Sequence, residues 1–401
     1  MATSILALTM FAFMAAPVAA QSPADSSVAD PPDPWGDEGV APDAVPERPL
    51  SGFAILVEQD QFAGQRNEDR NYTMGVGFQF PGSWSNTWAR GALQKPRALF
   101  DALFGIDRKR TKNALEGRSA GFSFENHSFL FGNTAFTPDS LNTTRPVYGD
   151  RPYSSLLFYT VSKAQVLRSG SGEDLDTVLR TEFTFGILGL RISEEVQTWI
   201  HGEIRKHNGK EVPYDPLGWP NQVSDGGEPT ARFGASYQRL TVNKRYADFS
   251  WKGEGNLGYY TNVAAGALTR LGWIDTPFWM FDPAPLVAVN EARETADRMR
   301  RGTRGWEAYA FAGGRCRLVA YNAMLQGQFR ESVHTLDPSQ IERVLFEFET
   351  GIRAGYRGWS VTWVTGAGRS PEHRLPEARS HYWGGIFVSY QAGYRRAGGG
   401  S

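Results

Sequence analysis

The feature that most constrains the fold of this chain is a strict two-residue alternation in the segment 72–80. Every second side chain there is large and apolar, and those between are small or polar, so an extended strand presents one apolar face. A soluble β-sandwich and a transmembrane β-barrel both require this pattern, and the alternation leaves both open. It returns at positions 382–390. The apolar residues of the first segment are Tyr72, Met74, Val76, Phe78 and Phe80.

The composition favours a barrel in a membrane. Gly 44, Trp 12, Tyr 15 and an aromatic content of 13% are typical of tightly paired strands with aromatic girdles at the membrane interfaces. After the N-terminal apolar run, the chain has no stretch of about 18 uncharged apolar residues, which excludes a helical membrane span. The single cysteine, Cys316, excludes an internal disulfide. With 42 basic and 43 acidic residues, no net charge favours a nucleic-acid partner.

Twelve segments of period two are separated by clusters of Gly, Asn, Asp and Pro between residues 51 and 392. A closed single-chain barrel needs an even number of strands with both ends on the periplasmic side, because an open sheet edge does not exist in lipid. We therefore predict an all-β fold, a twelve-stranded antiparallel transmembrane β-barrel with some helical loop insertions. The predicted strands are 51–59, 71–81, 119–131, 152–165, 176–189, 231–243, 246–254, 257–272, 305–328, 344–356, 358–368 and 381–392.

Two insertions between strands have the pattern of helices. The segment 89–118 places leucine and phenylalanine among basic residues, which predicts an amphipathic helical loop. Such a loop either packs on the barrel rim or contacts anionic lipid headgroups. The charged segment 291–301 predicts a second, solvated helix.

The two ends of the chain have compositions unlike the strands. Residues 1–20 combine an apolar run with small side chains before Gln21, which predicts a cleaved signal peptide. Residues 21–50 are rich in Pro, Asp and Ala, so we expect a disordered periplasmic tail. The barrel is expected over 51–392, and 393–401 is expected to be a short C-terminal extension.

Standard catalytic motifs are absent from the sequence: there is no G-x-S-x-G elbow, H-E-x-x-H helix, Walker sequence or Rossmann fingerprint. Polar clusters stand instead at the ends of the predicted strands. They include Glu-Gln-Asp, Asp-Arg-Asn-Tyr-Thr-Met-Gly, Gly-Asp-Arg-Pro-Tyr, Gly-Ile-Leu-Gly and Gln-Thr-Trp-Ile-His, at 58–60, 69–75, 149–153, 186–189 and 197–201, with further clusters at 136–138 and 218–222.

In this order and spacing, the clusters resemble the outer-membrane lipid A 3-O-deacylase family, over residues 52 to 392 or so. The resemblance implies a monomeric barrel in the bacterial outer membrane that hydrolyses the ester of the 3-position acyl chain of lipid A with the help of Ca²⁺. Its partners would be lipid A, as part of lipopolysaccharide, and other outer-membrane lipids.

The resemblance also assigns roles to individual residues. His201 stands at the position of the general base. Gln59 and Asp60 stand at an amide and acid pair that would also bind the metal, and Gln59 replaces the usual asparagine. Thr73 matches a hydroxyl in a Tyr-Thr pair, and Arg145 occupies the place of a catalytic lysine.

The chemistry of ester hydrolysis supports these residue types. A base that activates water near pH 7 has to be mostly neutral there, and an imidazole with an ordinary pKa of about 6.5 meets that demand. Ca²⁺ bound by hard oxygens would stabilise the developing oxyanion. Each residue also has a structural alternative: a solvated loop for His201, a turn for Asp60, strand propensity for Thr73 and an ion pair for Arg145.

Two other functions remain open at this point. A catalytically impaired barrel of the same family is consistent with Gln59 and with the unmatched lysine. An outer-membrane phospholipase would need a serine nucleophile, and no serine of the chain lies in a recognisable nucleophile motif.

Overall fold

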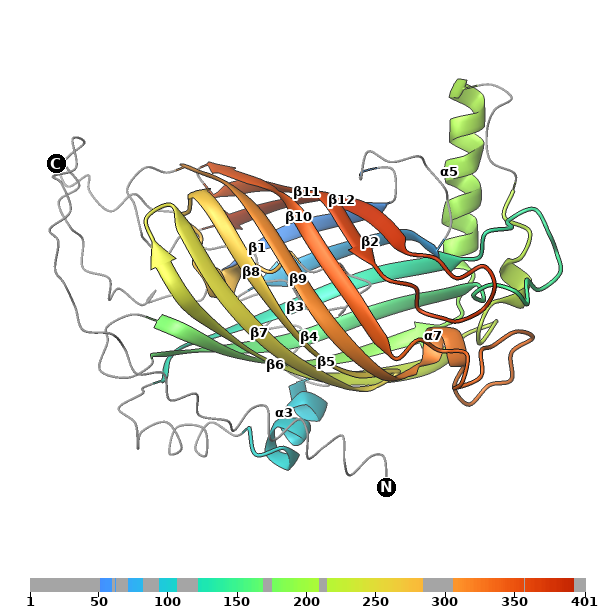
Figure 1. The fold of residues 1–401 in the computed structure, drawn as a ribbon, viewed down its shortest axis with the longest axis horizontal. Helices are drawn as coiled ribbons and strands as arrows, with labels where there is room; N and C mark the ends of the chain where they lie inside the picture. Colours follow the sequence, from blue (N-terminus) through green and yellow to red (C-terminus); the bar gives the residue numbers. More distant parts are fainter. Residues whose placement is uncertain are drawn as a thin grey trace, which may run out of the picture.

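A computed structural model describes residues 51–59, 62, 71–81, 94–106, 122–168, 175–208, 215–283, 306–356 and 358–392. Twelve strands form one closed antiparallel barrel in which each strand pairs with its neighbours in the chain and the first pairs with the last (Figure 1). The predicted fold class is thereby confirmed. The strands are β1 Ser51–Gln59, β2 Asn71–Pro81, β3 Phe122–Thr137, β4 Ser154–Arg168, β5 Leu175–Leu188, β6 Glu228–Lys244, β7 Ala247–Gly258, β8 Tyr260–Trp273, β9 Trp306–Asn322, β10 Val344–Tyr356, β11 Trp359–Arg369 and β12 His381–Ala392.

Two predicted strand ends were wrong by six residues, and the other boundaries differ by at most four. β3 continues to Thr137, past the predicted end at 131. β9 ends at Asn322 instead of 328, because the Asn322 side chain accepts a hydrogen bond from the Met324 amide at 3.1 Å and caps the short helix α7, Ala323–Gln326. The predicted signal peptide, periplasmic tail, C-terminal extension and helix at 291–301 lie outside the described residues.

The direction of the side chains shows that the barrel is built for lipid outside and polar groups inside. On β10, Phe346 and Ile352 are 64% and 51% exposed on the outer face. On the inner face, Arg317 of β9 donates to Glu254 of β7 at 2.7 Å and to Glu347 of β10 at 3.1 Å. An apolar exterior around a charged interior is the reverse of a soluble fold, and it settles the alternative between sandwich and barrel.

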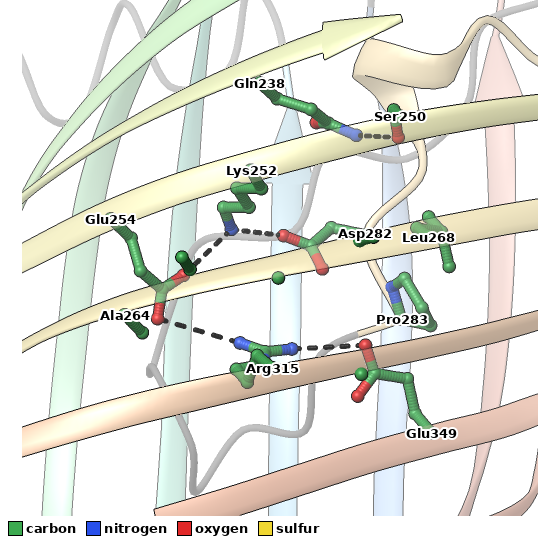
Figure 2. Close-up of a pocket in the computed structure, with 14 residues that line it drawn as sticks. Gln238, Ser250, Lys252, Glu254, Ala264, Leu268, Asp282, Pro283, Arg315 and Glu349 are labelled. Carbon is green, nitrogen blue, oxygen red and sulfur yellow. Dashed lines mark hydrogen bonds and ion pairs between the residues drawn. The ribbon is translucent and has the colours of Figure 1, made fainter. Parts of the chain in front are cut away.

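The lumen is filled by a segment that follows β8. Its 3-10 helix η3, Phe278–Met280, packs against inward-facing side chains of β4 to β6, and Arg180 donates to the Trp279 carbonyl at 3.0 Å. Lys252 pairs with Asp282 of the same segment at 2.8 Å. Figure 2 shows the pocket beside this pair, lined by further charged side chains including Glu349. The inside of the barrel is therefore a packed polar core.

A β-bulge in β2 corrects the simplest interpretation of the alternation at 72–80. The register shifts between Tyr72 and Met74, so Tyr72 points into the barrel and its hydroxyl donates to Glu58 at 2.5 Å. Met74 points outward, as do the apolar residues that follow it at every second position. One strand thus supplies an aromatic ring to the core and an apolar surface to the exterior.

Two helices lie outside the barrel, one beside its wall and one at an end of its strands (Figure 1). Helix α3, Gln94–Leu103, falls within the predicted segment 89–118, and it packs on the outer wall of the barrel instead of the rim. Helix α5, Ile192–Asn208, follows β5. Among the described residues, no helix is long and apolar enough to cross a membrane.

Candidate functional site

Helix α5 carries His201, and its two faces are reversed relative to a helix of a soluble protein. The face that it buries is polar: Ser193, Gln197 and His201 have exposed fractions of 0%, 2% and 3%. These residues are spaced four apart, so they form one stripe along the helix. The opposite face exposes Ile192, Val196 and Trp199 together with Glu195. A helix with this distribution fits a position beside the barrel in lipid.

The polar stripe of α5 holds the helix to the outer wall. Ser193 donates through Oγ to Oδ1 of Asn133, which is on the outward face of β3, at 3.0 Å. Gln197 accepts a hydrogen bond from the indole nitrogen of Trp219 at 2.9 Å. Trp219 is fully buried and packs against Met74 and other residues of the outer face of β2 and β3. The helix is therefore tied to the same side of the barrel as the outward residues of β1 to β3.

Two glycines of the predicted motifs allow this arrangement. Gly189 ends β5 with φ of +80°, and an added Cβ would lie 2.1 Å from the carbonyl oxygen of Ser224. Gly218 precedes Trp219, and a Cβ there would lie 2.4 Å from the ring of Tyr153. Both positions need a residue without a side chain, because the Ser224 carbonyl lies against the first and the Tyr153 ring against the second.

The structure places two of the predicted site residues on the outer face near the end of β1. Gln59 is the last residue of β1, half-buried and paired with Met74. Thr73 lies at the bulge of β2, and its hydroxyl is 2.8 Å from the hydroxyl of Thr137 at the end of β3. Asp60 lies outside the described residues. The outer ends of β1 to β3 and the polar stripe of α5 thus face the same region.

The other two predicted residues have different surroundings. His201 was expected in a loop; it lies on α5 and is buried. Arg145 lies in the exposed turn before β4, where its backbone amide donates to the Thr143 hydroxyl at 3.1 Å. In the part of the chain that the structure describes, its guanidinium makes no hydrogen bond or ion pair. The structure brings Gln59 and Thr73 together, and leaves Arg145 free to contact a ligand.

A buried ion network closes the outer end of the barrel around the motif 149–153. Arg151 donates to Glu372 at 3.1 Å, and the Asp150 carboxylate lies 3.3 Å from Nε2 of His373. Burial alone would raise the pKa of Asp150, but hydrogen bonds from His373 and from two backbone amides hold that pKa well below its ordinary value. These charges join the loop before β4 to the loop before β12, so they have a structural task.

Helix α5 and the contact of its Ser193 with Asn133 were missed by the sequence analysis. The signal was available as the spacing of Ser193, Gln197 and His201, which is helical. It was obscured because helices are usually recognised by an apolar stripe that faces a core, and here the buried stripe is polar.

Comparisons with known proteins identify the family and support the fold. A model of the family described as outer membrane protein LpxR matches residues 6–392. LpxR from Salmonella typhimurium matches with a TM-score of 0.57 and 15% identity, covering 85% of this chain and 99% of that one. The beta domain of the Bordetella autotransporter BrkA has a TM-score of 0.36 and 10% identity, covering 86% of this chain and 98% of that one. No curated protein matches the chain. At this identity, the Salmonella structure supports the barrel fold.

Proposed function

This chain belongs to the family of outer membrane protein LpxR and is an outer-membrane barrel, and from that premise we propose that it is a lipid A 3-O-deacylase. The reaction is hydrolysis of the ester that joins an acyl chain to the 3-position of lipid A, which yields a free fatty acid and a 3-hydroxyl group. The observation that carries the proposal, beside the family match, is the placement of His201 on the buried polar stripe of α5, outside the barrel wall.

That placement suits a substrate that stays in the membrane. The polar stripe of α5 faces the outer ends of β1 to β3, and the other side of the helix carries Ile192, Val196 and Trp199. A lipid that diffuses in the outer leaflet would meet these apolar side chains with its acyl chains. Its ester would then approach the polar groups without passing through the lumen, which the segment after β8 fills.

In the proposed mechanism, the imidazole of His201 takes a proton from a water molecule as the water oxygen attacks the ester carbonyl. The carbon–oxygen bond to the sugar then breaks, and the proton passes from the imidazole to the leaving sugar oxygen. Both transfers need one base that is mostly neutral near pH 7, and positioned acid–base catalysis of this kind contributes about 10²- to 10⁴-fold to the rate.

The remaining predicted residues would orient the reacting groups. The Thr73 hydroxyl, which lies 2.8 Å from that of Thr137, would direct a water or the ester carbonyl. Arg145 would form a bidentate contact with a lipid A phosphate, or donate to the oxyanion, because guanidinium geometry matches both.

A Ca²⁺ ion fits the donor chemistry at the end of β1. Gln59 and the hydroxyls of Thr73 and Thr137 are hard oxygen donors, which calcium prefers. Within the described ranges, no group of three or more His, Cys, Asp or Glu residues is arranged to hold a metal. Following the family resemblance, Gln59 and Asp60 would be the ligands, and the bound ion would supply positive charge to the developing oxyanion.

The decisive experiment is a His201→Ala substitution in a strain that makes the protein in its outer membrane. We expect mass spectrometry of lipid A to show loss of 3-O-deacylation, by about 10²- to 10⁴-fold in rate. The barrel should remain heat-modifiable on gels, because the substitution lies on α5 and not on a strand.

A His207→Ala variant is the matched control, since it changes a second histidine of the same helix. Deacylation that persists in His201→Ala would refute the proposed base. No deacylation by the unaltered protein would identify a catalytically impaired member of the family. Release of fatty acid from phospholipid, with lipid A unchanged, would identify a phospholipase.

A further inference from the structure

Helix α3 lies on the outer wall of the barrel, against the middle of strands β4 and β5. β2 runs antiparallel to β1, so the end of β2 at Pro81, from which the chain continues to α3, is at the same end of the barrel as Ser51. In an outer-membrane barrel with an even number of strands, the first strand begins and the last strand ends on the periplasmic side, so the chain leaves β2 for α3 on that side. The helix packs on Phe183 of β5 and Phe233 of β6, whose side chains alternate with inward-facing residues and therefore point outward.

The face that α3 turns to the barrel is charged and buried. Arg97 and Asp101 have exposed fractions of 5% and 4%. Asp101 accepts through one oxygen from Arg97 at 2.6 Å and from Lys163 of β4 at 3.0 Å. Arg97 also donates to the hydroxyl of Thr181 on β5 at 3.1 Å. We refer to Arg97, Asp101, Lys163 and Thr181 as the α3 cluster.

The α3 cluster lies on the side of the barrel that faces lipid. Lys163 and Thr181 are paired across β4 and β5, and the residues next to them, Ser162 and Glu182, point into the lumen. Their own side chains therefore point outward. A lysine and a threonine that face hydrocarbon without cover are costly, and α3 covers them.

The opposite face of α3 packs on no described residue and carries two exposed leucines, with Lys95 in the first turn. Leu99 and Leu103 are 59% and 69% exposed, on the side away from Arg97 and Asp101. The rings of Phe100 and Phe104 stack on Phe233 at 5.1 and 5.5 Å between centroids and fill the space between helix and wall. Polar groups toward the protein and leucines outward are the reverse of what water would select.

We propose that α3 is embedded in the hydrocarbon region of the outer membrane beside β5, and that its outer face binds the acyl chains of the surrounding lipids. The surface formed by Leu99 and Leu103 continues the lipid-facing aromatic surface of the neighbouring strands, which includes Tyr159 and Phe185. The α3 cluster anchors the helix at this depth, because its charges are neutralised against the wall. The helix is thus a lipid-binding surface separate from α5.

The test uses a fluorescent label that is sensitive to its environment, placed on single cysteines of the full protein in phospholipid vesicles. The native Cys316 is exposed on the lipid-facing side of β9, since its neighbours Arg315 and Arg317 point inward, so the unaltered protein supplies the lipid control. For the other sites, Cys316→Ser is combined with Leu99→Cys or with Phe329→Cys. Phe329 is 91% exposed in the outer loop after β9 and supplies the water control.

We expect the label at position 99 to lose fluorescence with phospholipids brominated on their acyl chains, as the label at Cys316 does, and to resist aqueous iodide. The proposal requires bromolipid quenching at position 99 above that at position 329, and iodide quenching below it. Any other result overturns it. The labelled position faces away from the barrel, so a failure to fold is not expected, and heat-modifiability checks this in each variant.

Discussion

Helices α3 and α5 are both attached to the outer wall of the barrel by buried polar side chains, but the types of side chain differ. Both lie outside the barrel, turn polar side chains to its wall and expose apolar ones. α3 buries an arginine and an aspartate, and a lysine from the wall completes the cluster. α5 buries Ser193, Gln197 and His201, a stripe without Asp, Glu, Lys or Arg.

This difference suits the α3 cluster to holding its helix in place and the α5 stripe to taking part in a reaction. A buried carboxylate shared by two cations cannot be exchanged for another partner without a large cost, so the α3 cluster fixes its helix in place. Hydroxyl, amide and imidazole groups tolerate a change of hydrogen-bond partner at a smaller cost. The α5 stripe therefore suits a surface where a substrate and a proton have to arrive and leave.

The largest expected effect is the loss of stability when the α3 cluster is broken. Asp101→Ala leaves Arg97 and Lys163 buried without their shared carboxylate, and we expect the free energy of unfolding to fall by about 3–5 kcal/mol. Denaturant titration of the protein in phospholipid vesicles, followed by tryptophan fluorescence, measures it.

A charge-free variant of the same cluster is the control. Asp101→Leu combined with Arg97→Met and Lys163→Met replaces the charges by apolar side chains of similar size, and should recover most of the loss. If this variant is no more stable than Asp101→Ala, the charges do not hold α3 as described.

An intermediate effect is expected where α5 begins. Gly189→Ala forces a Cβ against the carbonyl of Ser224 at a φ of +80°, which should cost about 1–3 kcal/mol. Because Gly189 directs the chain into α5, deacylation should also fall. The measurements are denaturant titration and lipid A mass spectrometry.

Gly202→Ala is the matched control within α5, since nothing lies within 4 Å of an added Cβ there. It should raise stability by about 0.5–1 kcal/mol, because alanine favours a helix more than glycine does. Equal behaviour of the two glycine variants would contradict the close contact at Gly189.

The smallest effect is expected for an exposed ion pair at the start of α5. Arg191 donates to Asp225 at 2.9 Å, and the arginine side chain is 55% exposed. Arg191→Ala should lower the free energy of unfolding by less than about 1 kcal/mol. A loss comparable to that of Asp101→Ala would remove the distinction between the two helices.

The stability contributed by the Arg191–Asp225 pair should decrease as the pH is lowered. Burial raises the pKa of Asp225, but hydrogen bonds from Arg191 and Gln222 outweigh it and lower the pKa below 3.8. The stability that the carboxylate contributes is thus complete above its unfolded pKa and is lost as the pH falls through the lower folded value. In the Arg191→Ala variant, unfolding titrations below pH 4 should show a smaller loss.

The local sequence pattern was sufficient to predict the strands, but not to predict which face of each helix is buried. The strands at 344–356 and 381–392 were predicted to the residue, because alternation and flanking turns are local properties of the chain. Tyr72 was assigned to the outer face and lies inside, since a bulge depends on the partner strand. α5 was missed because its stripe is recognisable only when the outside of the protein is known to be lipid.

The sequence by itself determined a closed ring of twelve strands and the order of the polar motifs at their ends, because both depend only on the spacing of residue types along the chain. Only the tertiary structure decided that Gln59 and Thr73 lie on the outer face with the stripe of α5, and that two helices bury polar groups against the wall. Those placements depend on contacts between residues far apart in sequence, and on which side of the barrel wall is polar.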